Sequence, residues 1–184
     1  MRARAFYQVT TAAAVLLGSL PAMAVSHGAA DAVWASRHVT FVYQGFTTHY
    51  SCDGLRDQIR GMLAKLGARH LEVRTYGCTR LVGVEPFPGV RVTMEVLVPA
   101  SSQHTNNAAS SVPAHWQNIV LMPNNAGLRE QGNCELIEQF KETFLPLFTT
   151  RHISYQSNCV PHQLTLGTHL SAEVLIPDSE PTRT

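Results

Sequence analysis

The sequence has almost no excess of charge of either sign. Lys and Arg number 14 against 13 Asp and Glu, and without Arg2 and Arg4 of the N-terminal segment the balance is 12 − 13 = −1, with His counted as neutral. No basic run is present to neutralise phosphates, so we expect no nucleic-acid partner. No basic amphipathic face indicates a membrane-surface protein either.

Sequence motifs for catalysis and for metal binding are missing as well. The chain has no Gly-x-Ser-x-Gly elbow, no Ser-x-x-Lys and no phosphate-cradling glycine loop. It has no Cys-x-x-Cys pair and no zincin-like His motif, although it contains nine His. We therefore predict no catalytic residue, no cofactor and no metal ligand. A Ser/His/Asp site assembled in space stays open, because such sites are defined by geometry rather than by spacing.

No apolar run reaches the ~20 residues that a membrane-spanning helix needs. The N-terminus instead has the pattern of an export signal: Arg2 and Arg4, a short apolar stretch from Thr11 to Leu20, and the small-x-small site Ala22-Met23-Ala24. We predict a signal peptide over residues 1–24. The mature protein is then expected in the periplasm or outside the cell, with no membrane insertion after cleavage.

The four cysteines that are present fit this oxidising location, where disulfides form. Four Cys allow three pairings. Cys52 and Cys78 stand 78 − 52 = 26 residues apart, and Cys134 and Cys159 stand 159 − 134 = 25 apart. The matching intervals favour the local pairs Cys52–Cys78 and Cys134–Cys159.

The matched cysteine intervals belong to a longer internal similarity. Arg69-His70 and Arg151-His152 each stand at the start of a strand-like run. In both cases the His comes 18 residues after the first cysteine of its pair, since 70 − 52 and 152 − 134 are both 18. The two similar stretches of chain then end on nearly the same strand, Glu95-Val96-Leu97-Val98-Pro99 and Glu173-Val174-Leu175-Ile176-Pro177. We infer a duplicated module. The expected organisation is a signal peptide (1–24), a first β-α-β-β repeat (25–99), a flexible linker (100–115), a second repeat (116–177) and a polar tail (178–184).

Apolar periodicity supplies the elements of each repeat. A helix is expected from the N-cap Ser51 to Gly67, and its apolar face is formed by Leu55, Ile59, Met62, Leu63 and Leu66. Another helix is expected from the N-cap Asn133 until Pro146 ends or bends it. Residues 25–36 are expected to be an irregular lead-in. The six expected strands span residues 38–43, 70–76, 90–98, 117–122, 152–157 and 169–176. The predicted fold class is α+β: two tandem β-α-β-β repeats, a mostly antiparallel sheet and two helices packed on one face.

Four residues are candidates for a ligand-binding face. His70 and His152 recur at equivalent places, and a twofold arrangement could bring them together as a pH-sensitive or ligand-binding pair. Glu95 and Glu173 alternate with apolar neighbours, so their side chains point away from the core. The alternative interpretation is a polar helix–strand boundary for the His and a solvated outer sheet face for the Glu.

Three functions remain open. The sequence favours an exported, disulfide-stapled binding module without catalytic activity, whose partner is an unknown envelope or extracellular protein or a small ligand. The first alternative is a small exported hydrolase with a site in the loops Gly83–Val90 or Pro123–Gly132. The second is a metal-handling protein that uses its His residues.

Overall fold

A computed structural model describes residues 30–79, 83–102, 111–121, 134–160 and 168–178. The predicted signal peptide, the predicted cap Asn133 and most of the polar tail lie outside these ranges. Within them, no helix combines the length and the apolar character needed to cross a membrane.

Six strands and two helices make up the described chain, in the order β-α-β-β twice over. Two short 3₁₀ turns, η1 and η2, follow β3 and α2. The elements are β1 (Ala30–Val42), α1 (Cys52–Lys65), β2 (Arg69–Tyr76), β3 (Gly89–Pro99), η1 (Ala100–Ser102), β4 (Val112–Leu121), α2 (Cys134–Thr143), η2 (Leu145–Leu147), β5 (Thr150–Gln156) and β6 (His169–Pro177). We call β1, α1, β2 and β3 the first unit, and β4, α2, β5 and β6 the second unit.

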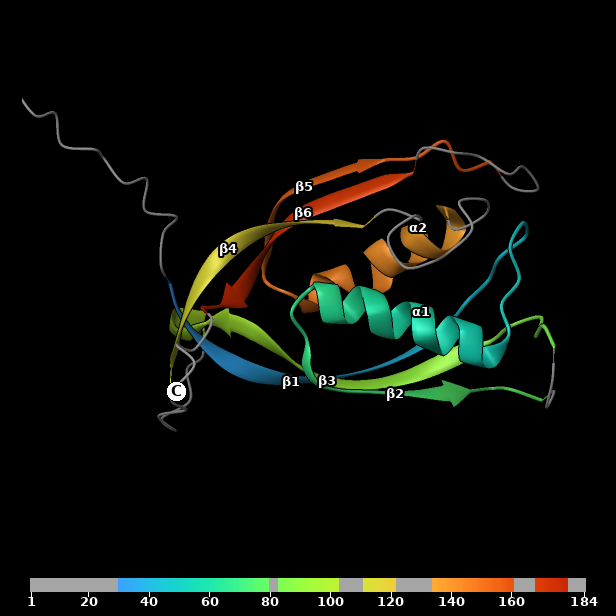
Figure 1. Ribbon diagram of the computed structural model, residues 1–184, viewed down its shortest axis with the longest axis horizontal. Coiled ribbons are helices and arrows are strands. Elements are labelled where there is room, and N and C mark those ends of the chain that lie inside the picture. The colour runs from blue at the N-terminus through green and yellow to red at the C-terminus, as the bar shows by residue number, and fades with distance from the viewer. Residues whose placement is uncertain (1–29, 80–82, 103–110, 122–133, 161–167, 179–184) are drawn as a thin grey trace, which may run out of the picture.

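All six strands form one antiparallel sheet in the order β2-β3-β1-β4-β6-β5. The order is symmetric: when each strand of one unit is exchanged for its equivalent in the other, the same order results, read from the opposite edge of the sheet. The units meet where Ala30–Ala32 of β1 pairs with Val112–Ala114 of β4. Figure 1 shows the sheet strongly bent at this junction, with α1 and α2 side by side between its two arms. The predicted α+β class, antiparallel sheet and shared helix face are confirmed, whereas the origin of the units in a tandem duplication stays a prediction.

The main core lies between the helices and the sheet. The predicted apolar face of the first helix is confirmed, because Leu55, Ile59 and Leu63 of α1 are fully buried. Ser51 caps this helix by accepting a hydrogen bond from the Gly54 N–H at 3.1 Å. Gly67 follows the helix with φ of 82°, a left-handed conformation that glycine adopts without strain.

The second helix is shorter than the first. It ends at Thr143 after 10 residues, whereas α1 has 14. Pro146 stands in the 3₁₀ turn that follows, so the prediction that proline interrupts the helix here is confirmed.

Each unit contains one disulfide, Cys52–Cys78 in the first and Cys134–Cys159 in the second. Both predicted pairings are confirmed. Each bridge ties the first residue of a helix to the chain just after an edge strand, β2 or β5, and therefore fixes the helix against the sheet.

Two strands begin well before the position that the sequence indicated. β1 begins at Ala30, within the expected lead-in, and β4 begins at Val112 rather than at residue 117. Near the junction of the units these strands are covered on both faces. Ala32, Val33 and Ala35 are all buried there, so the sequence shows small apolar residues without the alternation that marks a half-exposed strand.

Candidate binding site

The helix-free face of the sheet carries a second, smaller apolar cluster at the junction of the units. We call it the outer cluster. On β3, Val96 points to the helices and the adjacent Leu97 to the opposite face, because side chains alternate along a strand. The outer cluster consists of Ala32, Leu97, Ala114 and Leu175, with Trp34, Val112 and Trp116 packed against it.

In the first unit, a tryptophan of this cluster is covered by a polar group of three residues. The Arg69 guanidinium stacks on Trp34, with its Cζ 3.7 Å from the ring centroid. Arg69 Nε donates a hydrogen bond to Glu95 Oε2 at 2.7 Å, and His70 Nδ1 lies 3.0 Å from the same oxygen. Trp34, Arg69, His70 and Glu95 form the first quartet.

The second unit builds the same arrangement from equivalent residues. Arg151 stacks on Trp116 at 4.3 Å, and its Nε donates to Glu173 Oε2 at 2.5 Å. His152 Nδ1 lies 3.2 Å from that oxygen. Trp116, Arg151, His152 and Glu173 form the second quartet, on the same helix-free face as the first.

A β-bulge in each edge strand brings Arg and His to one carboxylate. On β2, Arg69 pairs with Glu95 and Glu72 pairs with Thr93, so His70 and Leu71 together face a single residue of β3. β5 has the same shift between Arg151 and Ser154. In a regular strand, consecutive side chains would point to opposite faces. The bulge places Arg and His on the same side.

Both histidines occupy a strained backbone conformation at these bulges. His70 has φ of 47° and His152 has φ of 50°, and no other described non-glycine residue has positive φ. Glycine is the usual residue for this conformation in a bulge, because a Cβ atom costs roughly 1–2 kcal/mol there. Strain of this kind tends to occur at functional positions, where a side chain is needed despite its cost.

The hydrogen bonds define the charge state of each quartet. The Arg69 hydrogen bond holds the pKa of the Glu95 carboxyl below its ordinary value, and His70 lowers that pKa further. Arg151 and His152 act in the same way on the pKa of Glu173. An ionised carboxylate only accepts hydrogen bonds, so the His Nδ1 carries a proton. A neutral imidazole then presents Nε2 as a hydrogen-bond acceptor.

The structure brings the four predicted face residues together in two pairs, His70 with Glu95 and His152 with Glu173. It does not pair the two histidines with each other, because they lie on β2 and β5, the two outermost strands of the sheet. Both imidazoles are exposed, with side-chain exposure of 75% and 72%. The exposed position of each Glu–His pair is compatible with the predicted ligand face.

Sequence reasoning missed the tryptophans and the stacking role of the arginines. Trp34 and Trp116 are the only tryptophans in the chain, and each follows an alanine by two residues, in Ala32-Val33-Trp34 and Ala114-His115-Trp116. This Ala-x-Trp match was the available signal. In both units the tryptophan stands 36 residues before the histidine of the Arg-His pair, since 70 − 34 and 152 − 116 are both 36.

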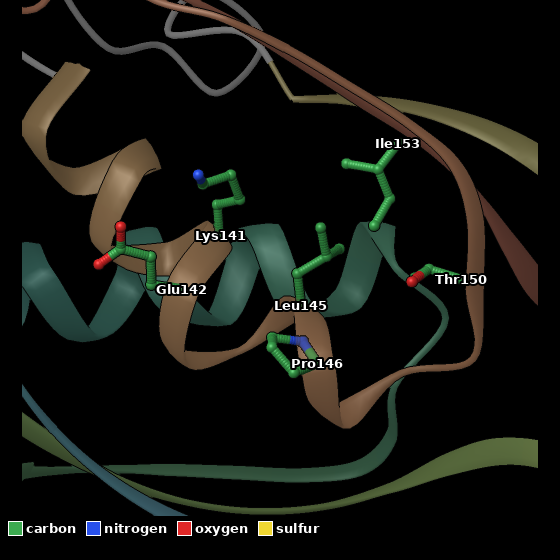
Figure 2. Close-up of a pocket in the computed structure, with 6 residues that line it drawn as sticks. All are labelled: Lys141, Glu142, Leu145, Pro146, Thr150 and Ile153. Carbon is green, nitrogen blue, oxygen red and sulfur yellow. The ribbon is translucent and has the colours of Figure 1, made fainter.

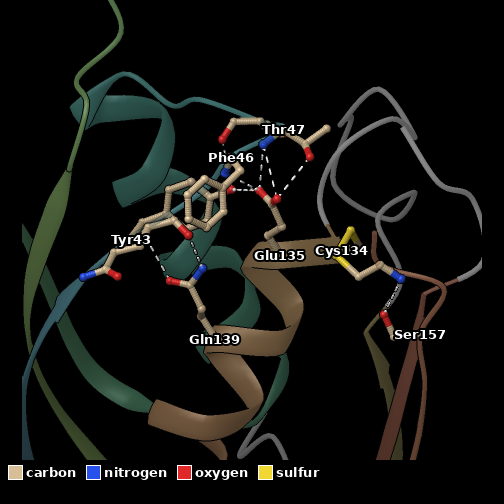
Figure 3. Close-up of a disulfide and its surroundings, with 10 residues drawn as sticks. Tyr43, Phe46, Thr47, Cys134, Glu135, Gln139 and Ser157 are labelled. Carbon is tan, nitrogen blue, oxygen red and sulfur yellow. Dashed lines mark hydrogen bonds between the residues drawn. A yellow bond between two sulfur atoms is a disulfide. The ribbon is translucent and has the colours of Figure 1, made fainter. Parts of the chain in front are cut away.

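A different polar contact joins the two units at the start of α2. Glu135, in the first turn of α2, is only 7% exposed and reaches the loop that follows β1 (Figure 3). Its carboxylate accepts hydrogen bonds from the Phe46 N–H at 3.0 Å, the Thr47 N–H at 3.1 Å and the Thr47 hydroxyl at 3.0 Å. The Tyr43 hydroxyl lies 3.2 Å from Glu135 Oε2.

Two further features support these contacts between Glu135 and the loop after β1, which we call the Glu135 clasp. Burial raises the pKa of Tyr43 far above its ordinary value, and the neighbouring Tyr50 and Glu135 add to the rise, so the hydroxyl keeps its proton. The Gln139 side chain accepts from the Gln44 N–H at 3.0 Å and donates to the Gln44 carbonyl at 2.7 Å. All these groups are engaged in holding the loop, which indicates a structural role.

A shallow groove lies beside β5, where the shortened second helix leaves Ile153 half exposed (Figure 2). Its volume is about 380 Å³, and its lining is mostly apolar. The lining residues are Lys141, Glu142, Leu145, Pro146, Thr150 and Ile153. No His is among them, so this groove does not supply the His-containing cleft that the hydrolase alternative requires.

The two other functional alternatives gain little from the described residues. Of the loops named for a hydrolase, Pro123–Gly132 lies outside them. In Gly83–Val90, Glu85 is buried and accepts a hydrogen bond from the Thr79 N–H at 2.8 Å. Within the described ranges, no group of three or more His, Cys, Asp or Glu is placed to hold a metal ion.

The quartets are thus the two places where exposed, chemically active side chains recur in the same geometry. Comparison with known proteins adds no further information. No family model matches the chain, and neither a curated protein nor a solved structure is significantly similar to it.

Proposed function

We propose that this chain is an exported, disulfide-stapled binding module without catalytic activity, which recognises an envelope or extracellular partner through the helix-free face of its sheet. The observation that carries the proposal is the construction of the same exposed quartet in both units. In each case the histidine accepts an unfavourable backbone conformation, for which packing alone gives no reason.

The surroundings of the quartets are suited to contact with a partner. The helices cover one face of the sheet and leave the other to exposed polar residues, among them Ser36, Thr93 and Asn118. Tryptophan and arginine, the central members of each quartet, are enriched at the energetic centres of protein interfaces. The disulfides and the Glu135 clasp hold the sheet and helices together, so the face is preorganised.

Affinity capture tests the proposal. Oxidised protein comprising residues 25–184 is immobilised and exposed to envelope and culture-supernatant fractions, beside a bait with Arg69→Gln and Arg151→Gln. The matched control bait carries Arg56→Gln, which alters a partly exposed arginine of α1 that pairs with Asp53 and Asp57. We expect one set of species on the wild-type and control baits that is lost from the double variant. Equal retention on all three baits would refute a role of this face.

A further inference from the structure

We infer that each quartet is a receptor for one carboxylate group, so that the partner of the helix-free face is a ligand carrying several carboxylates. This inference rests on the proposed function and specifies the chemistry of its partner. It follows from the donors that each quartet leaves available, from its charge and from its rigidity.

The available donors are at the outer edge of each guanidinium. Arg69 uses Nε for Glu95, and Arg151 uses Nε for Glu173. Within the described part of the chain, the Nη1 and Nη2 groups of both arginines hydrogen bond to no protein atom. The guanidinium side chains are 43% and 44% exposed, so these N–H groups are open to a ligand. Two parallel N–H groups match the two oxygens of a carboxylate.

The charge of the quartet favours a carboxylate over a phosphate. Each arginine is offset by the ionised glutamate that it contacts. With His counted as neutral, the imidazole adds no further charge. The quartet therefore has no surplus of positive charge with which to neutralise a phosphate dianion. A single negative charge aligned with the outer guanidinium edge is the better match.

The histidine extends the site beside the arginine. His70 Nδ1 and Arg69 Nε contact the same Glu95 oxygen, so the imidazole and the guanidinium lie next to each other. With Nδ1 protonated, an imidazole in its neutral form offers Nε2 as an acceptor. A ligand whose carboxylate neighbours an N–H group, as in an acidic polypeptide, satisfies both parts of the quartet.

Rigidity distinguishes these arginines from other surface arginines. Arg74, also on β2, pairs with the exposed Glu72, and no aromatic ring of the described residues lies against it. Arg69 and Arg151 are each fixed by a tryptophan face and a glutamate, so less side-chain entropy is lost when a ligand binds. Because both quartets lie on the helix-free face, a polymer with repeated carboxylates that is long enough to span both gains in affinity by occupying them together.

The chain provides its own fluorescent reporters for this site, since it has only two tryptophans and the arginine of each quartet stacks on one of them. The experiment is a titration of tryptophan emission with poly-glutamate at low ionic strength, where exposed charge contacts are least screened. Polyphosphate and uncharged dextran are titrated in parallel. We expect poly-glutamate, and neither of the other two polymers, to cause a saturable change in tryptophan emission. Each single variant, Trp34→Phe or Trp116→Phe, is expected to show a smaller change.

Arginine variants assign the change to the quartets. Arg69→Gln with Arg151→Gln is expected to weaken poly-glutamate binding at least tenfold, roughly the effect of losing a charge-assisted hydrogen-bond pair. Arg74→Gln, the matched control on the same strand, is expected to bind like wild type. No response to poly-glutamate, a response to polyphosphate alone, or equal weakening by the control variant would overturn the inference. If capture depends on Arg69 and Arg151 while poly-glutamate fails to bind, the carboxylate assignment is wrong and the binding face stands.

Discussion

Replacing Glu135 with alanine is expected to lower the free energy of unfolding by about 3 kcal/mol, although this residue lies far from the quartets. The change removes the acceptor of two backbone N–H groups and two hydroxyls, those of Tyr43 and Thr47, in the loop after β1. Each donor left unsatisfied in a partly buried place costs about 1–3 kcal/mol, and water entering the space recovers a part of the sum. Equilibrium urea denaturation followed by circular dichroism measures the difference.

Asp53 is the matched control for this experiment. It stands in the first turn of α1, as Glu135 does in α2, but its side chain is 74% exposed and, among the described residues, pairs only with Arg56. Asp53→Ala is expected to change the free energy of unfolding by about 0.5 kcal/mol or less, as exposed substitutions generally do. Similar losses from Asp53→Ala and Glu135→Ala would show that the loop contact contributes nothing beyond the charge at the helix start.

Removing one disulfide is the other change with a large expected effect. The double substitution Cys134→Ser, Cys159→Ser is expected to lower the free energy of unfolding by roughly 3–4 kcal/mol, because the open loop regains entropy in the unfolded chain. Cys52→Ser with Cys78→Ser should have nearly the same effect, since the bridges span 26 and 25 residues. The midpoints of thermal unfolding of both variants measure this.

The comparison between the two bridges carries its own control. Loop length predicts equal losses, whereas a role of one bridge in holding its helix on the sheet would make the losses unequal. If the variant lacking Cys134 and Cys159 melts at the wild-type temperature, the bridge does not constrain the unfolded chain as described.

Local patterns sufficed for much of the fold. The cap at Ser51, the apolar face of α1 and the interruption at Pro146 depend on neighbours within a few residues, and all were predicted. The disulfide pairs followed from matching intervals. β1 was placed too late, because burial on both faces of a strand removes the alternation by which its start would be recognised.

The candidate site was only partly predictable, because its residues meet across the sheet. The outward position of Glu95 followed from strand alternation. Its contact with Arg69 and His70 required the register of β2 against β3 and a bulge, which no local pattern indicates. The Glu135 contact joins residues 88 and 89 positions apart and needs the packing of one unit against the other.

The quartets also have a structural interpretation, in which they simply cover the outer cluster and attach the edge strands. The arginine–tryptophan stacks serve that purpose well. The histidines do not, because each is mostly exposed, and each occupies a backbone conformation that glycine would adopt at lower cost. A purely structural bulge would therefore gain from histidine only its contact with the glutamate of the same quartet.

The most direct test of the account is the free energy of unfolding of the double variant His70→Gly, His152→Gly, measured by urea denaturation together with retention of the captured species. If the histidines are present for binding, glycine relieves the strained conformations. Stability then stays at or above the wild-type value while capture is lost. A marked loss of stability with unchanged capture would contradict the account and would assign the quartets to the fold alone.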